Sequence, residues 1–269
     1  MFEIEIHDIK WNSIKIGNPE NPCMVFLHGF MGSSEDWIQI MKHFASEYYC
    51  IAFDLPGHNE TIVEGYDEFY TIENTCASLK KELANNGIKN FHLIGYSMGG
   101  RIALTFAVKY PETINKLVLI STSPGIESAD LREERKKFDA DIAEKIRTSE
   151  LHNFLKLWYS APIFKGLNQT NLYGKLISRR GYNNKEVLVK SLEYTGTGKM
   201  NPLWNDIQSF SKPVLLVAGE KDRKYCIINV KMNELFPNSS LAIIKDSAHI
   251  VHLEQPKEFE NELRNFIKQ

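Results

Sequence analysis

Residues 91–111 read FHLIGYSMGGRIALTFAVKYP, and this stretch decides the fold. It opens with an apolar run typical of a buried strand, and after Gly-Tyr-Ser-Met-Gly at 95–99 it continues as a helix-like segment that ends at a proline. A Gly-x-Ser-x-Gly sequence between a strand and a helix predicts a sharp, strained turn, because the glycines relieve crowding there. Such a turn lifts the Ser97 hydroxyl clear of the backbone. We therefore predict that Ser97 is a reactive centre, with an ordinary tight turn as the alternative.

Apolar runs like the one at 91–95 recur along the chain. They are rich in β-branched or aromatic residues and bounded by Gly, Pro, Asn or Asp: MVFLHG (24–29), YCIAFDL (49–55), KLVLI (116–120), PVLLVAG (213–219) and LAIIKD (241–246). Continuous apolarity suits strands that are covered on both faces, and helix-like segments lie between several of the runs. This alternation predicts an α/β fold with a mostly parallel, doubly wound sheet. The opening FEIEIHDIKWNSIKIG (2–17) predicts an antiparallel hairpin at the edge of the sheet.

The regular spacing of the strands breaks once, between Ile120 and Pro213. No run in this segment resembles a central strand. It holds charged amphipathic pieces instead: ADLREERKKFDADIAEKIR (129–147), SELHNFLKLWYSA (149–161) and NKEVLVKSLEYTG (184–196). We predict a helical cap over residues 123–208, inserted after the fourth parallel strand, between core segments 1–122 and 209–269.

The composition excludes several classes of protein. The chain has 269 residues, with 32 Lys and Arg against 34 Asp and Glu, which gives a formal net charge of -2 at pH 7. It has neither the basic excess that binds nucleic acid nor the acidic bulk of a disordered tail. The cysteines form no Cys-x-x-Cys pair, the N-terminus lacks a signal-peptide pattern, and no stretch is apolar for long enough to span a membrane. We expect a reduced, cytoplasmic protein, either a monomer or a small homo-oligomer.

A serine hydroxyl reacts only with the help of a general base that a carboxylate orients. On this fold the partners follow the serine in the order acid, then histidine. Asp222 and His249 each come just beyond the carboxyl end of a predicted strand, where such sheets place ligands. We therefore predict that Ser97, Asp222 and His249 act together. Other candidates stay open: Glu220, Asp206 and, more weakly, Asp246 as the acid, and His252 as the base.

A developing negative oxygen needs two preorganised hydrogen-bond donors. The N–H of Met98 is the first candidate, because it lies at the helix N-terminus after Ser97. The second is the N–H of Phe30, in the loop HGFMG (28–32) that follows the first core strand. His28 is then expected to organise this loop and to be one of the substrate-binding residues; a plain surface-turn histidine is the alternative.

The quoted motifs resemble those of known enzymes over the whole chain. Four segments resemble motifs of the α/β-hydrolase superfamily: HGF (28–30), DLPGH (54–58), GYSMGGR (95–101) and GEKD…AHIVH (219–252). A narrower resemblance rests on GYSMGGR together with STSPGI (121–126), LREER (131–135), WY…PIF (158–164) and TGTGKMNPLW (195–204). These segments are similar to the 2-succinyl-6-hydroxy-2,4-cyclohexadiene-1-carboxylate synthase family of menaquinone biosynthesis.

The narrower resemblance implies a lyase that eliminates pyruvate from an enolpyruvyl cyclohexene dicarboxylate bearing a succinyl chain. Ser97, activated by His249 and Asp222, would remove the proton α to the succinyl carbonyl, and the N–H groups of Phe30 and Met98 would hold the enolate. The resemblance implies no metal and no cofactor. A carboxylester or C–C bond hydrolase with the same trio is the first alternative, and a non-enzymatic binding module is the second.

A small substrate with several carboxylates demands cations with forked donors. Arg101 lies one helical turn beyond Ser97 and faces the same way, so it can reach the same cleft. The family resemblance adds further substrate-binding residues: Arg135 and Arg180, with Arg132 and Arg179 as adjacent alternatives, and Tyr96 and Trp158 as walls of the site. Without the resemblance, LREERKKFD would be a solvated helix with Glu–Arg pairs.

Two positions depart from the superfamily pattern. Asn59 stands in DLPGHNE where Gly is common, and Ala248 replaces the usual Gly before His249. If position 248 needs a positive φ, alanine costs more than glycine and shifts the His249 loop.

Overall fold

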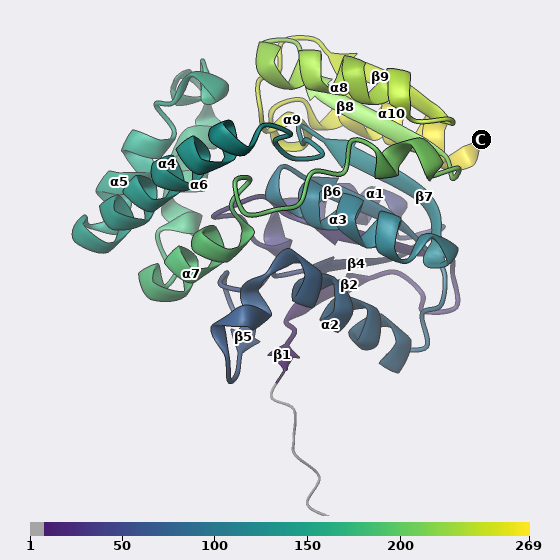
Figure 1. Cartoon of the computed structure of the whole chain (residues 1–269). Helices are drawn as coiled ribbons and strands as arrows, with labels where there is room; N and C mark the ends of the chain where they lie inside the picture. The colour runs from purple at the N-terminus through teal and green to yellow at the C-terminus, as the bar shows by residue number, and fades with distance from the viewer. Residues whose placement is uncertain (1–7) are drawn as a thin grey trace, which may run out of the picture.

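A central sheet of seven strands organises the chain; the structure is a computed structural model that describes residues 8–269 (Figure 1). The strand order is β2-β4-β3-β6-β7-β8-β9. Neighbouring strands are parallel, except that β2 runs antiparallel to β4 at one edge. The strands are β2 Ser13–Ile16, β3 Cys23–Leu27, β4 Tyr49–Phe53, β6 Phe91–Tyr96, β7 Ile114–Ile120, β8 Val214–Gly219 and β9 Ser239–Ile244. The prediction of a mostly parallel α/β sheet is confirmed.

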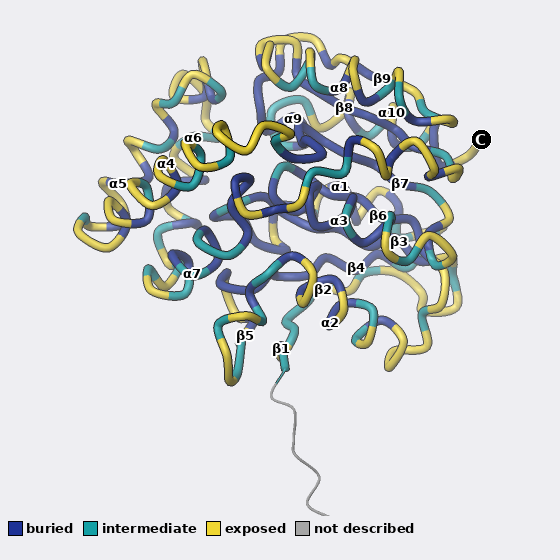
Figure 2. Tube along the Cα trace, in the orientation of Figure 1, coloured by how far each residue is buried: buried dark blue, intermediate teal, exposed yellow. Residues whose placement is uncertain are grey.

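Helices cover both faces of the sheet, as the unbroken apolarity of the strands requires. In β3, Met24 and Phe26 pack on one face while Val25 and Leu27 pack on the other, and all four are buried. Helices α1 and α10 lie on the first face, and α2, α3 and α8 lie on the second. Figure 2 shows the buried residues following the strands. The helices are α1 Ile38–Phe44, α2 Ile72–Asn85, α3 Met98–Lys109, α8 Arg223–Leu235, α9 Val251–Glu254 and α10 Pro256–Lys268.

The N-terminal segment joins the sheet without forming the predicted hairpin. β1 (Ile9–Lys10) pairs with β5 (Ile62–Val63), and β2 pairs with β4 instead of β1. The hairpin prediction is therefore wrong for residues 8–17, although an antiparallel strand does form the edge; residues 2–7, which make up most of the predicted first strand, lie outside the described residues. The physical reason lies at Trp11, where no Gly or Pro reverses the chain and the indole packs edge-on against Phe53 at 5.3 Å.

Between β7 and β8 the chain forms a group of helices that Figure 1 shows gathered at one end of the sheet. They are α4 Ala129–Thr148, α5 Leu151–Trp158, α6 Asn171–Arg180 and α7 Lys185–Thr195. The sequence pattern indicated α4, α5 and α7 but did not single out α6, which contains Gly174. Leu155 and Leu176 of these helices belong to the same apolar cluster as Ile94 of β6. The cap boundaries at 123 and 208 stay a prediction.

The cysteines are all free, and Cys23, Cys50 and Cys76 are buried. Burial raises the pKa of the Cys23 and Cys50 thiols to about 12, so they pack as small apolar groups. Among residues 8–269, no helix combines the length and apolarity needed to cross a membrane.

Replacing two helical glycines by alanine should change the free energy of unfolding in opposite directions. A Cβ at Gly99 would lie 2.4 Å from the His28 carbonyl oxygen and 2.5 Å from that of Leu27, and both are backbone atoms of the adjoining strand. We expect Gly99→Ala to lower the free energy of unfolding by about 1–3 kcal/mol. Gly174→Ala, with nothing within 4 Å of the new Cβ, should raise it by up to about 1 kcal/mol through helix propensity.

Urea unfolding of both variants measures these changes. Equal effects from the two substitutions would contradict the packing argument.

Candidate active site

Ser97 occupies the turn between β6 and α3 with φ 52° and ψ -109°. A positive φ is uncommon and strained for a residue other than glycine. The turn is tight on both sides, because a Cβ at Gly95 would lie 2.5 Å from the Gly99 carbonyl oxygen. The hydroxyl therefore projects from the carboxyl edge of the sheet, as the sequence motif predicts.

His249 and Asp222 extend a hydrogen-bonded chain from this hydroxyl. The Ser97 Oγ lies 3.0 Å from His249 Nε2, and His249 Nδ1 lies 2.6 Å from Asp222 Oδ2. Asp222 precedes α8 directly after β8, and His249 lies in the loop after β9. Both are buried, with 2% and 3% of their surface exposed. This geometry lets His249 accept a proton through Ser97 while Asp222 fixes the orientation of the ring.

The alternative acids and the alternative base lie elsewhere. Glu220, Asp206 and Asp246 are exposed, and Asp246 faces Lys221 at 3.5 Å. His252 is buried and stacks on Trp37, with ring centroids 4.2 Å apart. Burial lowers the pKa of His252 to about 3, which keeps the ring neutral. None of these groups touches Ser97.

The loop that holds His249 accommodates Ala248 without strain. Ala248 is not among the residues with positive φ; within this loop that conformation falls on Asp246, at 57°. The Glu254 carboxylate accepts the N–H groups of Ala248 and Ile250, each at 2.8 Å. At the other departure, Asn59 adopts φ 46° and its amide donates to Asp54 at 2.7 Å. Asparagine is among the residues that tolerate this conformation best.

Two residues whose backbone N–H groups have no acceptor among the described residues line the same cavity as Ser97. Met98 is the first residue of α3, so its N–H has no partner inside the helix. Phe30 lies in the loop after β3, and both residues line the same cavity as Ser97. Neither N–H donates to a hydrogen-bond acceptor within residues 8–269. The arrangement suits the stabilisation of a negative oxygen.

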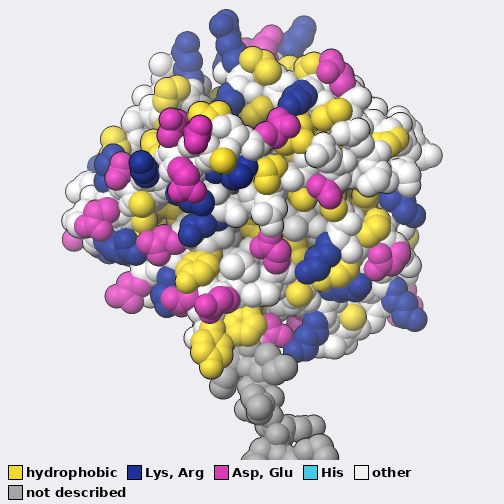
Figure 3. Space-filling view, viewed as in Figure 1, with side chains coloured by type: hydrophobic (Ala, Val, Ile, Leu, Met, Phe, Trp, Pro, Cys, Tyr) yellow, Lys and Arg dark blue, Asp and Glu magenta, His cyan; other side chains and the backbone are white. Residues whose placement is uncertain are grey.

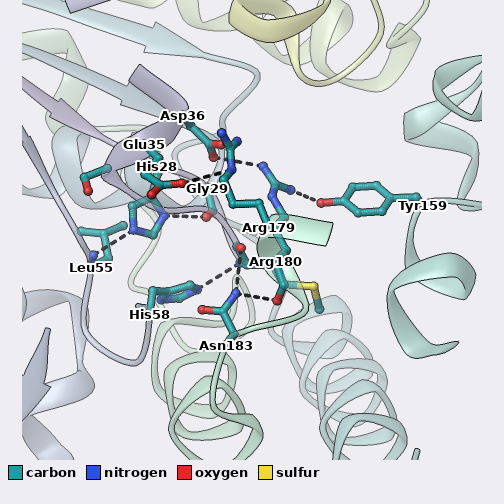
Figure 4. A network of polar contacts seen from close by, with 12 residues as sticks. His28, Gly29, Glu35, Asp36, Leu55, His58, Tyr159, Arg179, Arg180 and Asn183 are labelled. Carbon is teal, nitrogen blue, oxygen red and sulfur yellow. Dashed lines mark hydrogen bonds and ion pairs between the residues drawn. The ribbon is translucent and has the colours of Figure 1, made fainter. Parts of the chain in front are cut away.

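His28 holds this loop through hydrogen bonds to Gly29 and Leu55 (Figure 4). It is not among the residues that line the cavity. Its Nδ1 donates to the Gly29 carbonyl at 2.8 Å, and its Nε2 accepts the Leu55 N–H at 2.9 Å. The Met31 N–H donates to His58 Nε2 at 3.0 Å. Burial lowers the pKa of both histidines, that of His58 to about 3, so both rings are neutral. With both nitrogens occupied, His28 has no contact to offer a substrate.

The cavity above Ser97 has a volume of about 250 Å³. It is lined by several residues that the sequence and the resemblance indicated: Tyr96, Arg101, Arg135, Trp158 and Arg180. Arg132 and Arg179, the adjacent alternatives, do not line it. Trp158 packs edge-on against Phe30 at 5.6 Å, so it forms a wall beside the predicted oxyanion donor.

The arginines of the cavity differ in how far their charges are balanced. Arg135 donates to Asp139 at 2.8 Å. Arg101 donates only to the neutral Thr195 carbonyl, at 2.9 Å, and its buried Nε has no partner within residues 8–269. Burial lowers the pKa of Arg101 to about 10, and the neighbouring Arg135 adds to this effect. Arg101 therefore places a positive charge with unpaired N–H donors in the cavity.

Arg180 is bound by residues of the protein (Figure 4). It donates to Asp36 Oδ2 at 3.0 Å and to the hydroxyl of Tyr159, while Arg179 donates to the other oxygen of Asp36. Burial alone would raise the pKa of Asp36, but Arg180 and Arg179 outweigh it and hold the pKa below its usual value. The ion pair joins α6 of the cap to the short helical turn at Ser34–Trp37 of the core.

Sequence reasoning missed several residues of the cavity. Tyr225 packs on the His249 ring with centroids 4.8 Å apart, Phe164 approaches the same ring edge-on at 5.7 Å, and Lys224 and Phe138 also line the space. Lys224 and Tyr225 directly follow Asp222 and Arg223, so the first helical turn after the acid was the available signal. Within residues 8–269, no cluster of three or more His, Cys, Asp or Glu side chains is placed to hold a metal ion.

A protein-family model described as "alpha/beta hydrolase fold" matches residues 22–256. The sheet order, the strained serine turn and the Ser–His–Asp arrangement define the same class, so the protein is a member of the α/β-hydrolase superfamily.

Individual relatives narrow this class. A putative 2-succinyl-6-hydroxy-2,4-cyclohexadiene-1-carboxylate synthase from Bacillus subtilis is 34% identical over 93% of this chain and 92% of the relative. The synthase of that name from Escherichia coli O1:K1 is 31% identical over 90% and 92%. The structure of MenH from S. aureus superposes with a TM-score of 0.90 and 31% identity, covering 96% of this chain and 97% of that one. The chain belongs to the 2-succinyl-6-hydroxy-2,4-cyclohexadiene-1-carboxylate synthase family, which confirms the resemblance found in the sequence.

The buried carboxylate of Asp36 should contribute more to stability than the exposed carboxylate of Glu47, which also has two cationic partners. Asp36→Asn leaves Arg180 buried without a counter-charge, so we expect the free energy of unfolding to fall by about 3–5 kcal/mol. Glu47→Gln removes exposed pairs with Arg264 and Lys268, each at 2.9 Å, and should change the free energy of unfolding far less, because solvent screens exposed pairs.

The lowered pKa of Asp36 makes the free energy of unfolding depend on pH. Its contribution to stability is complete above the ordinary carboxyl value of 3.8 and is lost as pH falls through the lower pKa of the folded state. Unfolding curves between neutral and acid pH should show this loss in the wild type and not in Asp36→Asn. Parallel pH profiles would refute the assignment.

Proposed function

We propose that the chain eliminates pyruvate from 2-succinyl-5-enolpyruvyl-6-hydroxy-3-cyclohexene-1-carboxylate to give 2-succinyl-6-hydroxy-2,4-cyclohexadiene-1-carboxylate. The observation that carries this proposal is a Ser97–His249–Asp222 chain that opens into a cavity whose charged lining residues, apart from the triad histidine, are all Arg or Lys. An esterase for neutral substrates has no use for such a lining. The family to which the chain belongs supports the same reaction.

In the proposed reaction Ser97 acts as a proton carrier. The C–H bond α to the succinyl carbonyl breaks, and the proton passes through Ser97 Oγ to His249 Nε2. The electron pair first forms an enolate and then the C2–C3 double bond, the ring double bond moves from C3–C4 to C4–C5, and the C5–O bond to the enolpyruvyl group breaks. Pyruvate leaves as its enolate and takes up a proton, which His249 can return. Asp222 stabilises the imidazolium in between.

The N–H groups of Phe30 and Met98 are the proposed donors to the enolate oxygen. Their position beside Ser97 and their lack of another acceptor support this role. Tyr96 and Trp158 are proposed as walls that contact the ring of the substrate.

Arg101 and Arg135 are the proposed ligands of the substrate carboxylates. Arg180 reaches the same cavity, but Asp36 already balances its charge, so we assign it to holding the cap over the site and to the cavity wall. Residues 123–208 then form the cap, and segments 1–122 and 209–269 form the core that carries the triad. The free cysteines support a reducing, cytoplasmic setting.

The reaction can be tested directly. With the succinyl enolpyruvyl substrate, we expect the wild-type protein to release pyruvate and to turn over a nitrophenyl ester poorly. Ser97→Ala should abolish elimination, because alanine cannot carry the proton. Ser160→Ala, which removes an exposed cap hydroxyl bonded to the Leu157 carbonyl, should leave the rate unchanged. Rapid ester turnover without pyruvate would favour the hydrolase alternative.

Arg101→Ala should lower kcat/KM for pyruvate release by about 10-fold or more, because it removes a charge-assisted donor from a buried site. Arg147→Ala, which removes an exposed cation paired with Glu193, serves as the control. An unchanged kcat/KM for Arg101→Ala would exclude Arg101 from the site.

A further inference from the structure

The first turn of α8 places a cation beside the catalytic cavity that the triad and the arginines do not account for. Lys224 lies two residues beyond Asp222 and lines the cavity together with Ser97 and His249. Its ammonium interacts electrostatically with Arg135 and Arg101, which come from α4 and α3. Three separate elements therefore bring positive charge to one wall.

Lys224 forms no direct ion pair within residues 8–269. No carboxylate lies within 4.0 Å of its ammonium, whereas Arg135 has Asp139 and Arg180 has Asp36. No Asp or Glu lines the cavity at all. Arg101 and Lys224 are thus left as neighbouring cations without counter-ions, an arrangement that costs free energy until an anion binds between them.

The pKa of Lys224 reflects the same environment. Burial of the ammonium lowers the pKa, and Arg135 and Arg101 lower it further, although Asp222 and Asp139 act in the opposite direction. A bound carboxylate would relieve both the desolvation and the repulsion.

Lys224 also stands where the cavity meets the exterior. An outer groove of about 930 Å³ shares Ile163 and Lys224 with the cavity. Its other cations are Lys165, Lys221 and Arg223, against Glu220 and the buried Asp222. By contrast, the face of the molecule in Figure 3 shows cationic and anionic side chains interspersed. A path with a cationic excess raises the local concentration of an anionic substrate.

We propose that Lys224 binds a carboxylate of the substrate jointly with Arg101 and so helps to determine specificity for polycarboxylates. The inference rests on the proposed function, whose substrate carries carboxylates on the ring, the succinyl chain and the enolpyruvyl group. Arg180 is neutralised by Asp36 and Arg135 is paired with Asp139, so Arg101 and Lys224 are the two lining cations without an ion-pair partner among the described residues. Lys224 therefore adds a second cation for a carboxylate that Arg101 binds.

The test compares two neighbouring positions on the same helical turn. Both side chains are exposed, but Lys224→Gln removes a cation that lines the cavity as well as the outer groove, whereas Arg223→Gln removes one that lines only the groove. For each variant we would measure kcat and KM for pyruvate release. Calorimetry would give the affinity for 2-succinylbenzoate, a stable dicarboxylate with a carboxylate on the ring and one on the succinyl chain.

We expect Lys224→Gln to lower kcat/KM by about 10-fold or more, largely through KM, and to weaken binding of the dicarboxylate to a similar extent. Arg223→Gln should stay within about twofold of the wild type on both measures, as expected for a screened surface charge. Lys224→Arg should recover most of the loss, because it restores the cation.

The outcomes separate the two proposals. Equal effects from Lys224→Gln and Arg223→Gln, or no effect of Lys224→Gln on either measure, would overturn the role of Lys224 while leaving pyruvate release intact. If the wild type releases no pyruvate but binds the dicarboxylate through Lys224, the proposed function fails and the anion site stands. An unchanged urea midpoint for Lys224→Gln shows that the fold is retained.

Discussion

The positive φ of Ser97 is the constraint on which the rest of the site depends. A strained residue of this kind costs about 1–3 kcal/mol and persists only where its neighbours hold it. The Ser97 N–H donates to the Ile120 carbonyl at 2.9 Å, and the Thr122 hydroxyl donates to the Ser97 carbonyl at 2.8 Å. The Gly99 N–H donates to the His28 carbonyl at 3.1 Å. The ends of β7 and β3 thus hold the turn from both sides, which fixes the hydroxyl, the Met98 N–H and the neighbouring loop relative to one another.

Charge balance explains why cations in one cavity have different roles. Asp36 is fully buried and binds Arg179 and Arg180, so these arginines hold the cap to the core. Arg101 and Lys224 lack a carboxylate partner within the described chain and therefore have their donors available. The net charge of -2 says nothing about this division, because it averages over surface pairs that largely cancel.

The parts of the structure that depend on local patterns could be predicted from the sequence. The core strands follow from continuous apolar runs, and the Ser97 turn follows from its glycines and its place between strand and helix. The hairpin was mispredicted because alternation within a segment does not say which strand it will pair with. The pairing of Arg180 with Asp36 spans 144 positions along the chain, and no local signal marks it. Lys224 was missed for a related reason: its sequence neighbours show a helix start, but only the fold brings α3 and α4 beside it.

The partners of Arg101 and Arg180 also bear on how the family can diverge. Arg101 is held by the backbone carbonyl of Thr195, which any amino acid at that position would provide. Arg180 is held by the side chain of Asp36, so loss of Asp36 leaves a buried cation unpaired, whereas loss of Arg180 leaves Asp36 paired with Arg179. The bond to Arg101 therefore places no requirement on the side chain at position 195. The Thr195 hydroxyl does make a separate contact, 3.3 Å from the Met98 sulfur. Position 180 can therefore keep its arginine only where position 36 keeps its carboxylate, and an alignment of relatives should show an acidic residue at 36 wherever Arg180 is present.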